Sequence, residues 1–409
     1  MVNKWCCLNF LKATKKHYDS NKFSKKARNG GLDNTYAPPN RSNKFTFAPT
    51  MEDNRRESSQ RPVAIWLLIG IGMLIIQVLL GGITRLTGSG LSITEWKPII
   101  GAIPPMNDQQ WNEAFDKYKQ IAQYKYINSS FTLHDFKFIF FWEWFHRLWA
   151  RLMGIAFIIP FTVFLIQRRI RNEIIRPLLI LFLLGGLLGL IGWLMVATGL
   201  DDQHLYVSHY MLALHFNLGL GTICYAFWLA LNILLSRKEI IGNDALRNFT
   251  GWLIAILVLQ LIYGAFMAGL KAAPYAPTWP DINGNFLPHG GTPSTGVLQF
   301  FDNPIMVHFI HRTLGYVIFF LLIAWYFKGK RVEISWLFRK TIWIPVSIVT
   351  LQLLLGILTV LYSSHKNSLI WLGVSHQFIA MTLLLSLVFE FFILRGNKKL
   401  RAPGIRITS

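Results

Sequence analysis

Four histidines occupy matched places in the apolar stretches of this chain: His146, His215, His311 and His376. The stretch of chain between His146 and His215 is nearly as long as that between His311 and His376. Each histidine falls about six to ten residues after its apolar stretch begins, so all four are expected at one depth. Two neutral imidazoles on neighbouring helices suit the axial ligation of a haem iron. The spacing therefore predicts two ligand pairs, His146 with His215 and His311 with His376.

Two other interpretations of these histidines compete with haem ligation. A single buried histidine is more often a hydrogen-bonded core residue than a ligand, but four at matched depth favour ligation. Zinc suits the pattern less well, because no cysteine or further carboxylate lies at this depth to complete a tetrahedral site.

A carboxylate accompanies only one of the two histidine segments. Residues 143–147 read EWFHR, whereas residues 308–312 read HFIHR. Glu143 lies one helical turn before His146 on the same face, so its carboxylate is expected to face whatever that imidazole binds. The alternative is an ion pair between Glu143 and Arg147, four residues apart on that helix.

His308 takes the place of this carboxylate in the second segment, three residues before His311. Two equivalent haem sites should differ where one binds a reacting substrate and the other a permanent electron carrier. The segment with Glu143 is therefore the candidate reaction centre, and the role of His308 stays open.

A glycine-rich basic segment, GGITRLTGSG at 81–90, is expected as a turn at the level of the ligands. Guanidinium and ammonium groups pair well with carboxylates, so basic residues here could bind haem propionates. The alternative is an interfacial role, with apolar stems along the helices and charged heads in water. The candidates are Arg85, Lys97, Arg147 and Arg151.

The chain that must position these residues has the composition of an integral membrane protein. It is 53% hydrophobic and 15% charged, with a mean hydropathy of +0.37, whereas soluble proteins contain about 25% charged residues. Stretches of about 20 apolar residues, enough to cross roughly 30 Å of hydrocarbon, recur along it. Eight such stretches begin near Val63, Phe138, Pro177, Tyr206, Phe249, Pro304, Thr341 and Leu369. They do not alternate with period two, which excludes a β-barrel.

Basic connections alternate with connections that are nearly free of charge. The loops after the second, fourth and sixth stretches hold four, three and five Lys or Arg, and those after the third, fifth and seventh hold none, one and one. The positive-inside rule places the basic loops and both termini on the inner side. The net charge of +21 therefore orients helices, and no nucleic acid partner is expected.

The sequence also indicates an internal repeat. The pattern Q-x-x-x-G occurs at 77–81 and again at 260–264, and His311 and His376 follow His146 and His215 at nearly equal intervals. Such a parallel repeat implies two similar four-helix bundles related by an axis along the membrane normal. We expect an all-α integral membrane protein with an N-terminal half at 62–238, a C-terminal half at 245–398 and an inner tail at 399–409.

The N-terminal segment, positions 1–61, contains thirteen Lys or Arg against five Asp or Glu. It lacks the apolar core of a secretory signal, so the segment 1–61 is interpreted as a mitochondrial transit peptide followed by a matrix linker. The alternative is a cytoplasmic tail of a bacterial protein. The preferred location is the mitochondrial inner membrane, with both termini in the matrix.

Several segments together resemble the haem A synthase family, in particular its mitochondrial cytochrome c oxidase assembly branch and the proteobacterial relatives. They are GGITRLTGSGLSITEWKPIIGAIPP at 81–105, FKFIFFWEWFHRLWARLMG at 136–154, FIHR at 309–312 and SHQ at 375–377. The resemblance covers residues 62–395. It implies oxidation of the C8 methyl group of haem O to a formyl group, which gives the haem A of terminal oxidases.

The resemblance assigns His146 and His215 to the substrate haem and His311 and His376 to a bound haem b. It places Glu143 next to the reacting edge of the substrate. Iron supplies the redox chemistry in such a site, and a nearby carboxylate can accept a proton or position water.

Of the basic candidates, Arg85 and Arg147 are expected to bind the substrate haem. Haem O synthase and a ferredoxin-type redox protein are the implied partners beside membrane lipid, and a homo-oligomer is left open. The chain departs from the family in two ways: it lacks the outer-loop cysteine pairs of some bacterial members, and Ala150 stands where relatives often have glycine.

Two functions of other classes compete with this one. A di-haem electron carrier without catalysis predicts haems near opposite membrane faces, whereas the four histidines share one expected depth. A transporter is suggested only by the repeat, and the first and fifth apolar stretches are not conspicuously broken.

Overall fold

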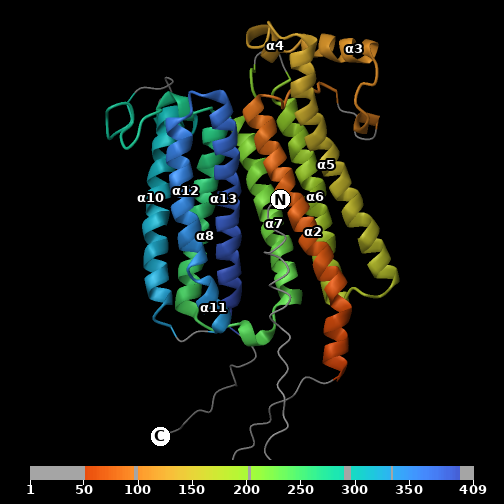
Figure 1. The fold of residues 1–409 in the computed structure, drawn as a ribbon, viewed down its shortest axis with the longest axis vertical. Helices are drawn as coiled ribbons and strands as arrows, with labels where there is room; N and C mark the ends of the chain where they lie inside the picture. Colours follow the sequence, from red (N-terminus) through yellow and green to blue (C-terminus); the bar gives the residue numbers. More distant parts are fainter. Residues whose placement is uncertain (1–50, 96–99, 201–203, 290–295, 333–334, 397–409) are drawn as a thin grey trace, which may run out of the picture. The chain divides into compact units, whose positions relative to one another are not determined.

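The computed structural model describes residues 51–95, 100–200, 204–289, 296–332 and 335–396. Most of the predicted transit peptide, the candidate Lys97 and the predicted inner tail lie outside these described residues. Within them, eight helices are long and apolar enough to cross a membrane, and the chain is therefore an all-helical membrane protein, as predicted (Figure 1).

The long helices are α2 (Met51–Thr87), α5 (Leu133–Ile166), α6 (Asn172–Ala197), α7 (His209–Leu234), α8 (Asp244–Gly269), α10 (Pro304–Gly329), α12 (Ile344–Leu361) and α13 (Lys366–Ile393). The shorter α-helices among the described residues are α3 (Asp108–Tyr118), α4 (Ala122–Tyr126), α9 (Gln299–Asp302) and α11 (Trp336–Thr341). The candidate span at Trp336–Leu361 combines α11 and α12.

Polar caps decide where several of these helices begin. Thr132 and Asp135 form a reciprocal capping box, so α5 begins at Leu133, before the expected Phe138. His146 consequently lies farther from the start of its helix than expected, and the predicted interval is wrong for this histidine. The glycine-rich segment was also assigned wrongly in part, because α2 continues through Gly81 to Thr87 and the turn begins only at Gly88.

The segment between α2 and α5 contains two helices that the sequence analysis did not anticipate. Phe115 of α3 stacks on Phe136 of α5 with ring centroids 5.0 Å apart, and Tyr118 packs on the same ring. Trp144 of α5 donates a hydrogen bond of 3.0 Å to the carbonyl of Ala102. The aromatic cluster holds this segment against the end of α5 that leads to Glu143.

The four helices α2, α7, α8 and α13 pack together at the centre of the described helices. α5 packs on α2, α6 on α7, α10 on α8 and α12 on α13, so each central helix has one peripheral neighbour (Figure 1). Two tryptophan side chains fasten α2 to α5: Trp66 donates to the carbonyl of Ala156 and Trp149 to that of Met73, both at 2.9 Å. The helix that carries His146 is thus fixed against the centre of the molecule.

Candidate functional site

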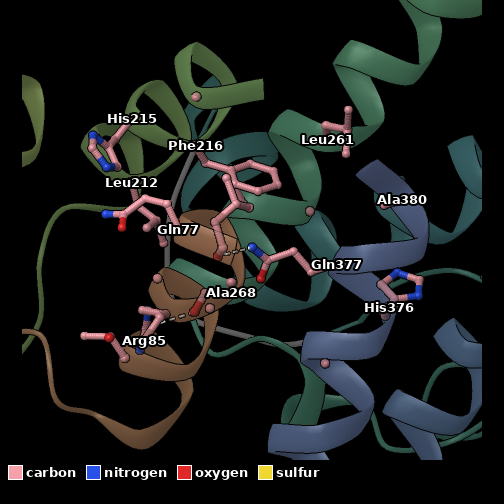
Figure 2. A pocket seen from close by; sticks show the side chains of 18 of the residues that line it. Gln77, Arg85, Leu212, His215, Phe216, Leu261, Ala268, His376, Gln377 and Ala380 are labelled. Atoms are coloured by element: carbon pink, nitrogen blue, oxygen red, sulfur yellow. Dashed lines mark hydrogen bonds between the residues drawn. The ribbon is translucent and has the colours of Figure 1, made fainter. Parts of the chain in front are cut away.

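All four predicted ligand histidines line one cavity of about 1160 Å³ between the long helices. Its walls are mostly apolar side chains and glycines, and Glu143 is the one carboxylate that the described residues contribute to them. Figure 2 shows His215 of α7 and His376 of α13 on two sides of this space, with Gln377 of α13 between them.

The rings of His311 on α10 and His376 on α13 face each other across part of the cavity. Their centroids are 6.3 Å apart and their planes are inclined by 69°. Two imidazoles that bind one metal ion from opposite sides, each through a bond of about 2 Å, place their ring centres about 6 Å apart. The donor set and its spacing therefore fit an iron with two axial histidine ligands.

His146 on α5 and His215 on α7 line the same cavity, as the other predicted pair. Every one of the four imidazoles lies against a glycine of a neighbouring helix. A Cβ atom added at the glycine would come within 2.9 to 3.2 Å of the Cε1 atom of the ring, closer than a side chain normally tolerates. The contacts are Gly81 with His146, Gly192 with His215, Gly264 with His311 and Gly356 with His376. The rings thus rest on helix backbone.

Two glutamines contact the ring nitrogens of these histidines, and the sequence analysis did not assign them to the site. Gln77 Nε2 lies 3.2 Å from His146 Nε2, and Gln352 Nε2 lies 3.1 Å from His376 Nε2. Each glutamine precedes by four residues the glycine that contacts the same ring. The Q-x-x-x-G spacing was therefore a signal for the site as well as for the repeat.

Glu143 is buried, with 2% of its surface exposed. Arg147 Nη2 donates to Glu143 Oε1 at 2.5 Å, while Ser92 Oγ and the backbone N–H of Ile93 donate to Oε2 at 2.7 and 2.9 Å. The ion pair that was the alternative role for Glu143 is thus present. Because Glu143 also lines the cavity, the two roles are compatible, and the catalytic one stays a prediction.

His308 occupies the corresponding place on α10, completely buried. Arg312 Nε donates to His308 Nε2 at 3.0 Å, and the guanidinium also donates to the backbone carbonyls of Ala276, Thr278 and Asp281. Arg312 therefore holds the loop after α8 against α10, as Arg147 holds Ile93 on α5.

Arg85 of α2 lines the cavity and donates to the backbone carbonyls of Ala268 and Gly269 at 2.6 and 2.8 Å (Figure 2). A second link between α2 and the C-terminal helices comes from Gln377, whose amide donates to the carbonyl of Val78 at 2.9 Å. Arg147 and Arg151 also line the cavity. Whether any of these groups binds a propionate stays a prediction.

One further basic group at the cavity was missed because it lies in a loop far along the chain. The ammonium of Lys271 lies 3.7 Å from the ring centre of Tyr206, and Lys366 and Arg85 line the cavity beside it. Burial, reinforced by the positive charges of Arg85 and Lys366, lowers the pKa of Lys271 to about 8. An ammonium held close to other cations favours an anionic partner.

Residues 64–388 match a family model, COX15-CtaA, which is described as a cytochrome oxidase assembly protein. A haem A synthase of Parvibaculum lavamentivorans is 41% identical over 347 residues, which are 82% of this chain and 96% of that protein. One from Flavobacterium psychrophilum is 39% identical over 331 residues, 80% of this chain and 96% of the relative. One from Bartonella bacilliformis is 38% identical over 357 residues, with 87% and 97% covered.

Proposed function

The chain belongs to the COX15-CtaA family of cytochrome oxidase assembly proteins, and on this premise we propose that it is a haem A synthase. The enzyme is a membrane oxidoreductase that converts the C8 methyl group of haem O to a formyl group. The observation that carries this function is the cavity with two imidazole pairs, of which only the first has a carboxylate one helical turn away.

We assign the substrate haem to His146 and His215 and a resident haem b to His311 and His376. The 6.3 Å separation of the second pair supports its role as a ligand pair. The shared Q-x-x-x-G spacing and the four glycine contacts support two related four-helix bundles, α2, α5, α6 and α7 in one and α8, α10, α12 and α13 in the other. We call them the first and second bundle.

Glu143 is the group of this chain that would handle protons released from the methyl group. Its side chain is held by Arg147 and Ser92, which fixes the carboxylate at the wall of the cavity. Repeated oxidation of a methyl group to an aldehyde releases protons at each stage, and a positioned carboxylate can accept them or orient water. Haem b, when bound, supplies one-electron transfer.

Basic groups at the same end of the helices suit the propionates of the substrate. We propose Arg85 and Arg147 for this role because both line the cavity beside the first imidazole pair. A guanidinium that already binds backbone carbonyls keeps further N–H donors, so the present bonds of Arg85 do not exclude a carboxylate partner.

We further propose that the protein lies in the mitochondrial inner membrane, with both termini in the matrix. The basic N-terminal segment and the distribution of Lys and Arg support this location and orientation. Haem O synthase would deliver the substrate, a ferredoxin-type protein would exchange electrons, and a homo-oligomer is compatible with the exposed apolar helices.

The proposed function is tested by purifying the protein from membranes and separating its extracted haems by chromatography. Haem b together with haem O or haem A is the expected result. Haem b as the single species would contradict the assignment and would favour an electron carrier without catalysis.

A further inference from the structure

The first and second bundle differ where their two peripheral helices meet. In the second bundle α10 packs along α12, whereas the corresponding helices α5 and α6 have hardly any close backbone approach. No side chain in the most apolar part of α5 is buried inside the protein, and few in α6 are. Residues of both helices nevertheless line the cavity, so the cavity extends into the space between them.

Glycines of α6 line this space. Gly185, Gly186 and Gly189 are exposed, line the cavity and would accept a Cβ atom with nothing within 4 Å of it. Gly189 precedes by three residues Gly192, which contacts His215. At 1.5 Å per residue, the exposed glycines extend from about 4 Å to about 10 Å along α6 from that contact.

The second bundle fills the same positions with larger side chains. When Gly192 of the first bundle is aligned with Gly356 of the second, Gly185 corresponds to Val349 and Gly189 corresponds to Leu353. Val349 is 4% exposed and belongs to the buried core together with Ile318. The cavity reaches α10 and α12 as well, but their close packing and these larger side chains leave less space between them than glycines leave between α5 and α6.

Aromatic rings close the space on the side away from the histidines. Phe157 of α5 and Phe182 of α6 stack with centroids 5.9 Å apart and planes inclined by 21°. The opening is thus bounded by an imidazole pair at one end and a ring pair at the other, with glycines on α6 and Gly154 on α5 along its length.

We infer that haem O enters the first bundle sideways from the bilayer between α5 and α6, and that its isoprenoid tail lies in this gap against Gly185 and Gly189. The inference rests on the proposed function. Haem O carries a long apolar tail and partitions into hydrocarbon, so a route through lipid keeps that tail out of water throughout. Haem b has a vinyl group in place of the tail, and in the second bundle, which we assign to haem b, the corresponding helices α10 and α12 pack closely together.

The test fills the gap with the residues of the second bundle, in the double variant Gly185→Val and Gly189→Leu. Apo-protein in nanodiscs is titrated separately with haem O and with haem b, and conversion of haem O is followed by chromatography. The matched control is Leu190→Phe, which adds volume to the same helix at a side chain that is 51% exposed and does not line the cavity.

The double variant should bind one equivalent of haem O at least about tenfold more weakly, as expected when groups in an apolar pocket overlap the ligand, and should convert it correspondingly less. Its binding of haem b should be unchanged, and the control should resemble the wild type. Equal losses for both haems would overturn the inference, because the added side chains would then disturb the site as a whole. Unchanged haem O binding would also overturn it, because the isoprenoid tail would then lie outside the space that the new side chains fill. If the wild type itself made no haem A, the proposed function would fail instead.

Discussion

Arg85 on α2 donates a hydrogen bond of 2.6 Å to the backbone carbonyl of Ala268 in the last turn of α8. Arg85 lies eight residues after Gln77, and Ala268 lies eight residues after Gln260, the equivalent glutamine of the repeat. The Arg85 side chain therefore binds the backbone of the residue that occupies its own position in the second bundle. The last carbonyls of a helix lack the usual partners four residues on. That of Ala268 also accepts from the backbone N–H of Lys271 at 3.3 Å, and Arg85 donates both to it and to the carbonyl of Gly269. One arginine therefore joins the bundles beside the cavity.

Replacing Arg85 with Met should lower the free energy of unfolding by about 2 to 4 kcal/mol, since hydrogen bonds to charged groups contribute about 1.5 to 3 kcal/mol each and the carbonyl of Gly269 loses its donor. Thermal and denaturant unfolding in one detergent would measure the change. Arg168→Met, in an exposed loop, is the control. Equal stabilities of both variants and wild type would contradict this structural role.

Ligand assignment is tested by single histidine substitutions. His311→Ala or His376→Ala should remove the low-spin haem b absorbance, whereas His146→Ala or His215→Ala should mainly impair retention or conversion of haem O. Visible spectra and haem content per purified protein measure both effects. His289→Ala, at an exposed loop position, should change neither. Normal spectra and turnover in all four variants would refute the two pairs.

Glu143→Gln separates chemistry from binding, because it keeps the side-chain volume while removing the ionisable group. If the carboxylate assists oxidation, the variant should bind haem yet accumulate haem O or a partly oxidised product, with turnover reduced by about 10²- to 10⁴-fold. Haem A output is measured per folded, haem-loaded protein. Wild-type output would exclude a catalytic role.

Arg147→Gln provides the comparison for the ion pair. Breaking a buried pair leaves the Glu143 carboxylate without its cation, so this variant should lose stability as well as activity. If Glu143 served only the ion pair, both substitutions should produce similar losses of stability and similar losses of output.

Topology is tested by labelling single cysteines with a membrane-impermeant thiol reagent in a background without Cys6, Cys7 and Cys224. Asn285→Cys, in the exposed loop between α8 and α9, should react from the intermembrane-space side. Ser236→Cys, in the loop after α7, should react only after the matrix side is opened. The reverse pattern would overturn the proposed orientation.

Lys271 predicts a pH dependence of stability. Its pKa is lowered from 10.5 to about 8, so between these values the unfolded chain binds more protons than the folded one. Stability should therefore rise with pH across this window, less than the full shift implies because the group is only partly buried. Lys271→Met should lack the rise, and unfolding at pH 7.5, 8.5 and 9.5 would show it. If the difference in free energy of unfolding between the wild type and the variant did not change with pH, the prediction would be contradicted.

The apolar stretches were long enough to predict the eight long helices, but not where each begins. The capping box at Thr132 and Asp135 extends α5 beyond its apolar part, and a hydropathy pattern does not register such local hydrogen bonds. The helices α3 and α4 were missed for a related reason, since they are short; aromatic contacts hold α3 on α5 and hold α4 on α3.

The site was predictable in its residue types and less so in its contacts. His311 and His376 face each other as their spacing suggested. Gln352 contacts His376 on the next helix along the chain, whereas Gln377 contacts α2, which is distant in sequence. In the sequence, Gln77 and Gln260 mark the internal repeat. What they touch depends on which helix faces which, and periodicity alone does not determine that.

The glycine contact of each imidazole has a consequence for the rate at which haem can leave. An exposed side chain changes rotamer in picoseconds to nanoseconds, whereas helices move past one another in microseconds to milliseconds. A Cβ atom added at Gly192 would lie 2.9 Å from Cε1 of His215. The imidazole therefore has no free volume on the side of α6 into which it can rotate. We therefore expect release of a haem bound by His215 to require movement of α6 against α7, on the timescale of helix displacement and not of side-chain rotation.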